Sequence, residues 1–269
     1  MTRLISGALL VVGVVVALWF LAPIYLVAIA LAVALLAFRE YVEIASRAGV
    51  RVSKPAGATA VALACVAVAI PGMPVEAVLA GTTLGLSSLA LSRWLEKGTA
   101  GGGETSGALA TAAIAAFAPL YIGVPIGLIA ATRWNLGREA ALLLILTVAI
   151  SDTFQYYSGR TFGRRLLAPV VSPKKTIEGA IGGFVGAALA LAIIGAWWLP
   201  HMGLVARVLL GLAIAAVGIV GDLFESLLKR SVSMKDASSV IPGHGGVLDR
   251  IDALLFAAPV FYVFVRYSY

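Results

Sequence analysis

The chain has 269 residues, of which 61% are hydrophobic and 12% are charged, about half of the charged fraction of a typical soluble protein. Together with a mean hydropathy of +1.02, this composition excludes a soluble domain. In a soluble chain the net charge of +7 would suggest nucleic acid, but basic loops that face anionic lipid headgroups explain it here, and we expect no nucleic-acid partner. Cys65 is the only cysteine, which excludes an intrachain disulfide and a cysteine metal cluster.

Apolar segments of about the length that a bilayer crossing needs recur along the whole chain. Their approximate ranges are 4–22, 23–38, 56–72, 75–91, 107–131, 138–158, 177–199, 204–224 and 252–267. Pro23 marks a hairpin between the first two, and Pro119 and Pro125 are expected to bend the fifth. The sequence thus predicts an all-α, polytopic integral membrane helix bundle of about nine transmembrane helices. About four form an N-terminal part, 1–106, and about five form a C-terminal catalytic region, 107–269.

Basic residues are divided unevenly between the two sides that nine crossings create. One side carries all of the 20 lysines and arginines except Arg133, Arg138, Arg207 and Arg266. Because cytoplasmic loops carry an excess of Lys and Arg, we expect that side in the cytoplasm. It includes the N-terminus and the polar loops 159–176 and 225–251, while the C-terminus is expected outside. The membrane we expect is a bacterial inner (plasma) membrane.

The sixth predicted span and the segment after it carry the first polar groups of interest. Asp152 lies within an apolar span, where an ionisable residue is by default a functional candidate. Lys174 and Lys175 suit either a polyphosphate anchor beside a helix N-terminus or the positive charge of a cytoplasmic loop. Ser172 or Thr176 can cap the next helix. Glycines at spacings of three and four in that helix predict close packing against a neighbour: Gly179, Gly182, Gly183 and Gly186.

The eighth predicted span ends in a cluster of charged and hydroxyl side chains. On a helix, Asp222, Ser226 and Lys229 share one face at spacings of four and three, and Glu225 borders it. An internal ion pair of Lys229 with Asp222 or with Glu225 would by itself explain these charges. The hydroxyl group between acid and base, and the further acids downstream, favour a catalytic site.

The loop that follows is rich in glycine and opens the last helix. Gly245 and Gly246 come directly after His244, and they let backbone amides approach a ligand closely, which favours a phosphate at the helix N-terminus. We expect His244 to contact phosphate or to support the structure of the site. Asp249 and Asp252 lie three residues apart in the first turn. Such paired carboxylates suit Mg²⁺, or they merely satisfy the helix dipole.

Residues 226–252 carry a resemblance to a known family. They contain Ser-Leu-Leu-Lys-Arg, then Lys-Asp, then Pro-Gly-His-Gly-Gly-Val-Leu-Asp-Arg-Ile-Asp, and this string resembles the signature of the phosphatidate cytidylyltransferases, also called CDP-diglyceride synthases. Residues 152–179 are similar to another segment of that family. The resemblance covers about residues 145–265. The chain departs from it at Gln155, where a small residue is expected, and at Ala237-Ser238-Ser239, which is less rich in glycine.

The resemblance implies transfer of the cytidylyl group of CTP to phosphatidate, giving CDP-diacylglycerol and pyrophosphate in phospholipid synthesis. The implied cofactor is Mg²⁺, with space for a second metal ion. The implied partners are CTP, phosphatidate and membrane lipids, and a homodimer is compatible with the sequence. We assign the metal to Asp222, Asp249 and Asp252, with Asp236 and Asp152 as second choices. Ser226 and Lys229 complete the catalytic set, and the substrate phosphates are assigned to Lys174, Lys175, Arg230, Lys235, His244, Gly245 and Gly246.

Three other functions are compatible with parts of this pattern. A related CTP-dependent cytidylyltransferase would act on a different lipid phosphate or alcohol. A CDP-alcohol phosphotransferase would need a longer series of spaced aspartates than this chain has. A membrane carrier for an anionic substrate would place its ionisable residues near mid-membrane in broken helices, whereas these acids cluster at one predicted surface.

Overall fold

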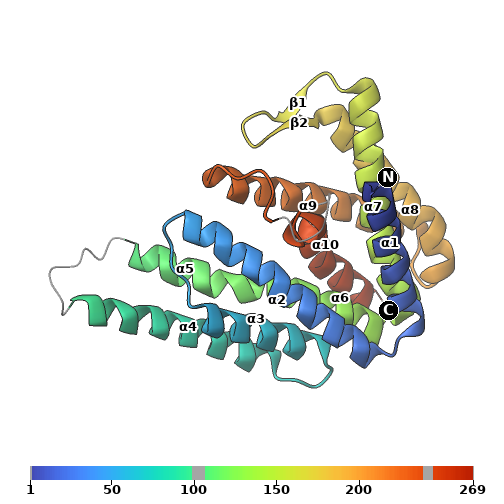
Figure 1. The fold of residues 1–269 in the computed structure, drawn as a ribbon. Helices are drawn as coiled ribbons and strands as arrows, with labels where there is room; N and C mark the ends of the chain where they lie inside the picture. The colour runs from blue at the N-terminus through green and yellow to red at the C-terminus, as the bar shows by residue number, and fades with distance from the viewer. Residues whose placement is uncertain (1, 99–106, 239–244, 269) are drawn as a thin grey trace.

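The structure, a computed structural model, describes residues 2–98, 107–238 and 245–268. It is a bundle of α-helices with one small β-hairpin (Figure 1). Each of the nine predicted spans corresponds to a helical segment, and six segments of the described chain are long and apolar enough to cross a membrane. The all-α, polytopic class is therefore confirmed. The predicted division at residue 106 falls outside the described residues and stays a prediction.

The N-terminal half contributes four helices: α1 (Thr2–Phe20), α2 (Pro23–Arg47), α3 (Lys54–Ala69) and α4 (Val75–Gly98). Pro23 lies in the first turn of α2, where its missing N–H costs nothing because that group would have no partner inside the helix. The predicted hairpin between the first two spans is thereby confirmed. α2 extends beyond the predicted span to Arg47, so its last turns carry charged residues.

The fifth predicted span is one irregular helical segment. It comprises α5 (Ala108–Ala118), a π-helix η1 (Pro119–Gly123) and α6 (Val124–Asn135). Pro119 begins the π-helix because its ring clashes with the preceding turn and it cannot donate a backbone hydrogen bond. The irregularity predicted from the prolines therefore takes the form of a π-helical turn.

The C-terminal half contains α7 (Gly137–Phe162), β1 (Leu166–Ala168), β2 (Ser172–Thr176), α8 (Ile177–Trp198), α9 (Leu204–Ser231) and α10 (Leu248–Tyr267). The antiparallel β1–β2 hairpin lies in the loop predicted at 159–176 and projects from the ends of α7 and α8 (Figure 1). α7 and α8 pack closely through glycine, as predicted. A Cβ atom at Gly183 would collide with Gln155, and one at Gly186 would lie 2.7 Å from the ring of Phe154.

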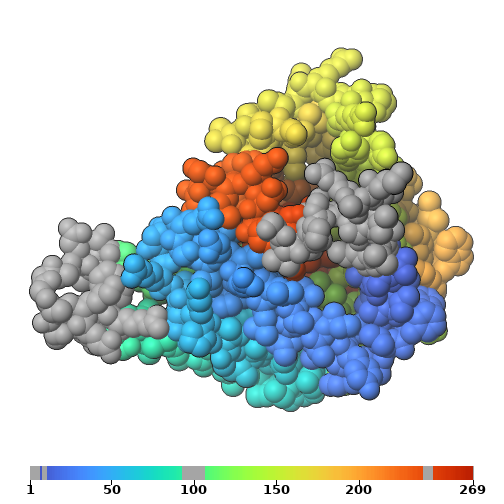
Figure 2. Space-filling view, in the orientation of Figure 1, coloured from blue at the N-terminus to red at the C-terminus, as the bar shows by residue number. Residues whose placement is uncertain are grey.

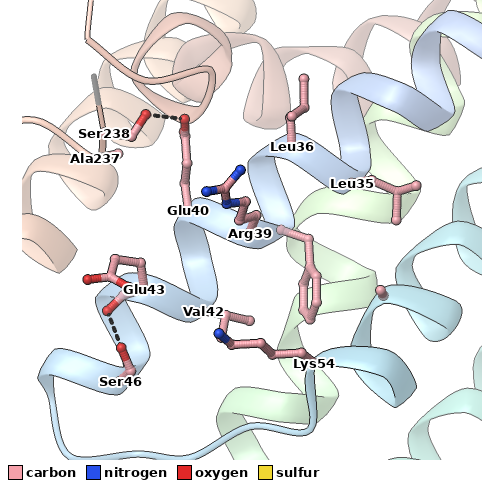
Figure 3. A pocket seen from close by; sticks show the side chains of 12 residues that line it. Leu35, Leu36, Arg39, Glu40, Val42, Glu43, Ser46, Lys54, Ala237 and Ser238 are labelled. Atoms are coloured by element: carbon pink, nitrogen blue, oxygen red, sulfur yellow. Dashed lines mark hydrogen bonds between the residues drawn. The ribbon is translucent and has the colours of Figure 1, made fainter. Parts of the chain in front are cut away.

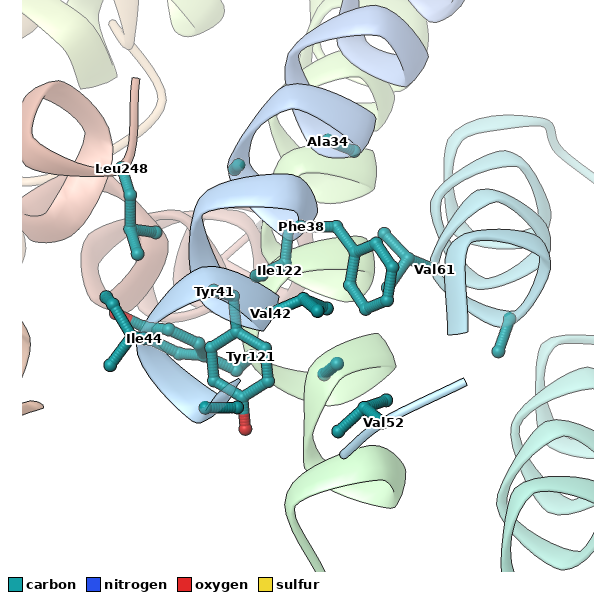
Figure 4. Packing of buried hydrophobic residues seen from close by; sticks show 14 of the residues in the cluster. Ala34, Phe38, Tyr41, Val42, Ile44, Val52, Val61, Tyr121, Ile122 and Leu248 are labelled. Atoms are coloured by element: carbon teal, nitrogen blue, oxygen red, sulfur yellow. The ribbon is translucent and has the colours of Figure 1, made fainter. Parts of the chain in front are cut away.

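The two halves share one hydrophobic core. Phe38 and Tyr41 of α2 pack with Tyr121 of the π-helix and with Leu248, the first residue of α10 (Figure 4). Leu248 is fully buried. The start of α10 is thus fixed against α2, a helix nearly the whole chain away in sequence.

Candidate active site

A cavity of about 550 Å³ lies between the β-hairpin and helices α7, α8, α9 and α10. Figure 2 shows the hairpin (yellow) beside α9 (orange-red) on one face of the molecule. The volume is typical of a site for a small molecule or cofactor. Several residues predicted from the sequence line this cavity together: Asp152, Lys174, Lys175, Asp222, Asp249 and Asp252.

Three carboxylates in this cavity come from three different helices. Asp152 lies on α7, Asp222 on α9 and Asp252 on α10, and they are near enough to influence one another electrostatically. Lys175 on β2 forms an ion pair with Asp222. Asp152 and Asp252 form no ion pair among the described residues, and burial makes repulsion between neighbouring carboxylates costly. A cation bound between these acids would relieve that repulsion.

The β-hairpin is held beside the cavity by the first turn of α8. Glu178 Oε2 accepts hydrogen bonds from the backbone N–H groups of Arg164 at 3.0 Å and Arg165 at 3.2 Å. Thr176 Oγ1 accepts one from the N–H of Gly179 at 3.1 Å, so Thr176 is the N-cap of α8, as predicted. These bonds fix the end of β2 and with it the lysines that precede Thr176.

Basic side chains from both sides of the cavity suit an anionic ligand. Lys174 and Lys175 reach it from β2, as the sequence analysis had predicted. Arg160 on α7 and Arg250 on α10 also line it, and neither was assigned to phosphate from the sequence. Arg160 Nη1 donates a hydrogen bond to the hydroxyl of Tyr156 at 3.3 Å, which turns the guanidinium along the helix. Four cations beside four carboxylates can hold both a metal ion and phosphate groups.

Lys229 links α9 to α10 through two carboxylates. Its Nζ atom lies 2.6 Å from Glu225 Oε2 and 2.6 Å from Asp249 Oδ1. Glu225 is only 1% exposed, so Lys229 gives its carboxyl group a polar partner in place of water. Of the two ion pairs considered from the sequence, the one with Glu225 forms, while Asp222 pairs with Lys175.

Asp249 also organises the glycine loop. Its Oδ2 atom accepts hydrogen bonds from the N–H of Ala237 at 3.0 Å and of Gly246 at 2.7 Å. Gly245 has φ +82°, and a Cβ atom there would lie 2.7 Å from the same oxygen. Gly245 thus adopts a positive φ, and glycine is also required because the carboxylate approaches so closely. The N–H of Gly246, expected on a ligand phosphate, points to Asp249 here.

The remaining predicted residues lie around this centre. Ser226 is half-buried on α9, one turn after Asp222. Arg230 is exposed and donates to the carbonyl of Met234 at 3.2 Å, which joins the end of α9 to the loop that follows. Lys235 and Asp236 are exposed on the following loop. His244 lies outside the described residues. The site roles of these side chains stay predictions.

Glu40 on α2 is a polar residue of the site region that the sequence reasoning missed. It is 3% exposed. Its Oε1 atom accepts hydrogen bonds from Ser238 Oγ at 2.6 Å and from the N–H of Val247 at 2.9 Å, and its Oε2 atom accepts one from the N–H of Leu248 at 2.7 Å. The available signal was an acid with buried apolar residues at helical spacing on both sides, Ala37 and Ile44, which places it on the inner face of α2.

The donor chemistry of the cavity fits a hard divalent cation. Among the described residues, no three His, Cys, Asp or Glu side chains converge closely enough to form a complete protein cage for a metal. Mg²⁺ does not need such a cage, because one or two carboxylates suffice when water and substrate phosphates complete its shell. Asp222 and Asp252, with Asp152 nearby, offer these oxygen ligands. Both oxygens of Asp249 already accept hydrogen bonds, so its predicted place in the metal shell requires an exchange of partners.

Fold and cavity together define an integral membrane protein whose polar site combines carboxylates with basic side chains. The chain belongs to the Cytidylyltransferase family, whose model matches residues 1–268. Membership of this family confirms the resemblance that residues 226–252 carry.

Named relatives point in the same direction. The chain is 46% identical over 122 residues to the phosphatidate cytidylyltransferase of Aquifex aeolicus (strain VF5), covering 45% of each chain. It is 44% identical over 133 residues to the enzyme of that name from Haemophilus influenzae, covering 48% of this chain and 46% of the relative. It is also 44% identical over 133 residues to YnbB of Escherichia coli (strain K12), an uncharacterized protein, covering 48% and 44%. In each case the match spans less than half of the relative's length.

Proposed function

We propose that this protein is a phosphatidate cytidylyltransferase, which uses CTP and phosphatidate to make CDP-diacylglycerol and pyrophosphate. Membership of the family and the names of two relatives support the reaction type. The observation that carries the proposal is the cavity between the hairpin and the helix ends, where four carboxylates meet four basic side chains. A carrier for anions would not need this density of acids beside the cations.

The reaction joins two anions, so the protein must screen charge and align the reactants. An oxygen of the lipid phosphate attacks the α-phosphorus of CTP, and the bond from that phosphorus to the oxygen of the β-phosphate breaks. Pyrophosphate carries away the electron pair, and no covalent nucleophile from the protein is required. Lys174 and Lys175 on one wall, with Arg160 and Arg250 on the others, hold the phosphates in line and stabilise the leaving group.

The acids of the cavity are proposed to hold Mg²⁺, with Asp222 and Asp252 as direct ligands. When bound, Mg²⁺ would neutralise charge on the phosphate oxygens of CTP. Asp249 is a further candidate ligand. To bind the metal it would have to give up its contact with Lys229 or with a backbone N–H group. Lys175 lies at the edge of this acid group, so it brings a phosphate next to the carboxylates.

The membrane placement follows from the distribution of charge. We propose a bacterial inner membrane, with the N-terminus and the loops 159–176 and 225–251 in the cytoplasm and the C-terminus outside. This orientation gives the cavity access to CTP from the cytoplasm and to phosphatidate from the adjacent leaflet.

Product analysis tests the proposal directly. Purified protein is incubated with CTP, phosphatidate and Mg²⁺, and the lipid fraction is analysed by mass spectrometry. CDP-diacylglycerol in the lipid fraction, with one pyrophosphate released per lipid, is expected. A product formed only from another lipid phosphate would establish the related cytidylyltransferase instead. Binding of CTP without turnover on any lipid phosphate would overturn the enzymatic proposal.

A further inference from the structure

We propose that Glu40 is a positioning residue of the active site, supplied by the N-terminal half of the chain. Its carboxylate fixes the start of α10 and so determines where Asp249 and Asp252 lie. The inference rests on the proposed function in so far as these two acids belong to the catalytic cavity. Figure 3 shows Glu40 reaching from α2 to Ser238, at the wall of a second cavity of about 530 Å³.

The first step is that α10 has no N-cap side chain of its own. Its N-cap residue is Val247, which cannot accept a hydrogen bond through its side chain. The first N–H groups of a helix have no partner within the helix and need an acceptor from elsewhere. Glu40 supplies that acceptor to Val247 and Leu248 from another helix, and its negative charge also lies at the positive end of the α10 dipole.

The second step is that the local sequence accommodates Glu40. A Cβ atom at Gly246 would lie 2.6 Å from Glu40 Oε2, so only glycine allows this approach. Among the described residues no basic side chain forms a salt bridge with Glu40. A buried carboxylate with this many N–H and O–H donors is balanced by them and by the helix dipole, which makes the arrangement depend on a charged acceptor.

The third step connects Glu40 to the chemistry. Asp249 and Glu40 each accept hydrogen bonds from the same two parts of the loop, residues 237–238 and residues 246–247. Asp249 binds the N–H groups of Ala237 and Gly246, while Glu40 binds the neighbours of these residues, Ser238 and Val247. Without Glu40, Asp249 would be the one carboxylate among the described residues that accepts from both pieces of this loop, and Asp249 itself lines the cavity. The N-terminal half therefore does more than anchor the protein in the membrane.

The variants Glu40→Gln and Glu40→Asp test the proposal, with Glu43→Gln as the matched control. Glu43 lies one turn further along α2, is 54% exposed and pairs only with Arg47 in the described chain. Gln keeps one acceptor oxygen but turns an NH₂ group towards the backbone N–H groups. We expect Glu40→Gln to lower kcat at saturating CTP and phosphatidate by about tenfold or more, Glu40→Asp to retain part of the activity, and Glu43→Gln to match wild type.

Hydrogen exchange of the same proteins supplies a readout independent of turnover. Amides of residues 245–252 should exchange faster in Glu40→Gln, while those of α7 and α8 remain as protected as in wild type. A purely structural role would lower the yield of folded protein or make amides exchange faster throughout the chain. In that case kcat per folded molecule would be unchanged. That result, or unchanged kcat with unchanged exchange at 245–252, would overturn the proposal.

Two further provisions keep the test decisive. If Glu40→Gln does not accumulate as folded protein, Ser238→Ala removes one of its bonds, and it should give a smaller loss of kcat with faster exchange in 245–252. Wild-type activity and exchange in Ser238→Ala and in Glu40→Asp would then refute the inference. If the wild-type protein makes no CDP-diacylglycerol, the proposed function fails, while the exchange experiment still decides whether Glu40 positions the start of α10.

Discussion

Lys175 on β2 and Asp222 on α9 form an ion pair that joins the β-hairpin to the helix bundle inside the candidate active site. The lysine side chain is 19% exposed and the aspartate side chain 35% exposed, so the pair lies at the edge of the cavity rather than in the core. Under the proposed function, Lys175 exchanges this carboxylate for a phosphate when a substrate enters.

The variant Lys175→Gln should lower CDP-diacylglycerol formation by about a hundredfold at low CTP, because a charge-assisted contact to phosphate is lost. The loss should be visible mainly in kcat/KM for CTP. Initial rates over a range of CTP concentrations measure it. Arg138→Gln is the control, since Arg138 pairs with Glu139 and is not among the residues lining the cavity. Equal losses in the two variants would remove Lys175 from the site.

The variant Asp249→Asn should abolish turnover while the protein still inserts and folds. The substitution keeps the size of the side chain but removes the charge that faces Lys229 and the proposed metal. Turnover is measured across a titration of Mg²⁺, and folding by gel filtration in detergent. Activity like that of wild type at saturating Mg²⁺ would show that Asp249 serves the loop alone.

Lys229 lends itself to a stability prediction. Lys229→Gln leaves Glu225, which is 1% exposed, without its ion-pair partner, and this should cost roughly 3 kcal/mol of stability. The double variant Glu225→Gln with Lys229→Gln should recover much of that loss, because no uncompensated charge stays buried. Thermal unfolding in detergent measures both variants. Arg47→Gln is the control, because it removes an exposed ion pair, Arg47 with Glu43, that contributes at most about 1 kcal/mol. A single variant no less stable than the double one would contradict this account.

Hydropathy and proline positions were sufficient to predict the helices, because length and apolarity of a span depend on local sequence. Close packing of α7 on α8 was also predictable, since glycine spacing is local too. The β1–β2 hairpin was not predicted, because its strands are short and have no pattern of their own. The backbone N–H groups just before β1 donate to Glu178, a contact that no local pattern indicates. The sequence indicated the polar residues of this segment but not that they form a β-hairpin.

The site was predictable where its residues share a motif and not where distant segments meet. Lys229 was assigned one acid partner from its own helix, but its second partner, Asp249, comes from the next helix. Glu40 was missed because its partners lie 198 to 208 residues further along the chain. Its contacts depend on how α2 packs against the start of α10, which no local spacing encodes.

The close contact between α7 and α8 at Gly183 predicts that a larger side chain there destabilises the protein. A Cβ atom at Gly183 would collide with the side chain of Gln155, so Gly183→Val should push α8 away from α7 and lower the melting temperature. Because the same helices carry the hairpin and Asp152, activity should fall as well. Gly81→Val is the control, since a Cβ atom there meets nothing within 4 Å. Similar melting temperatures for both variants would refute the packing argument.

The last prediction concerns orientation. If nine crossings and the uneven distribution of basic residues are right, a cysteine in Ser233→Cys should react with an impermeant thiol reagent only in inverted vesicles, and one in Ser268→Cys only in right-side-out vesicles or intact spheroplasts. Both serines are exposed, and Ser233 follows α9 directly. Cys65 is fully buried, and Cys65→Ala removes any remaining background. Labelling of both positions from the same side would mean that α10, the predicted span between them, does not cross the membrane.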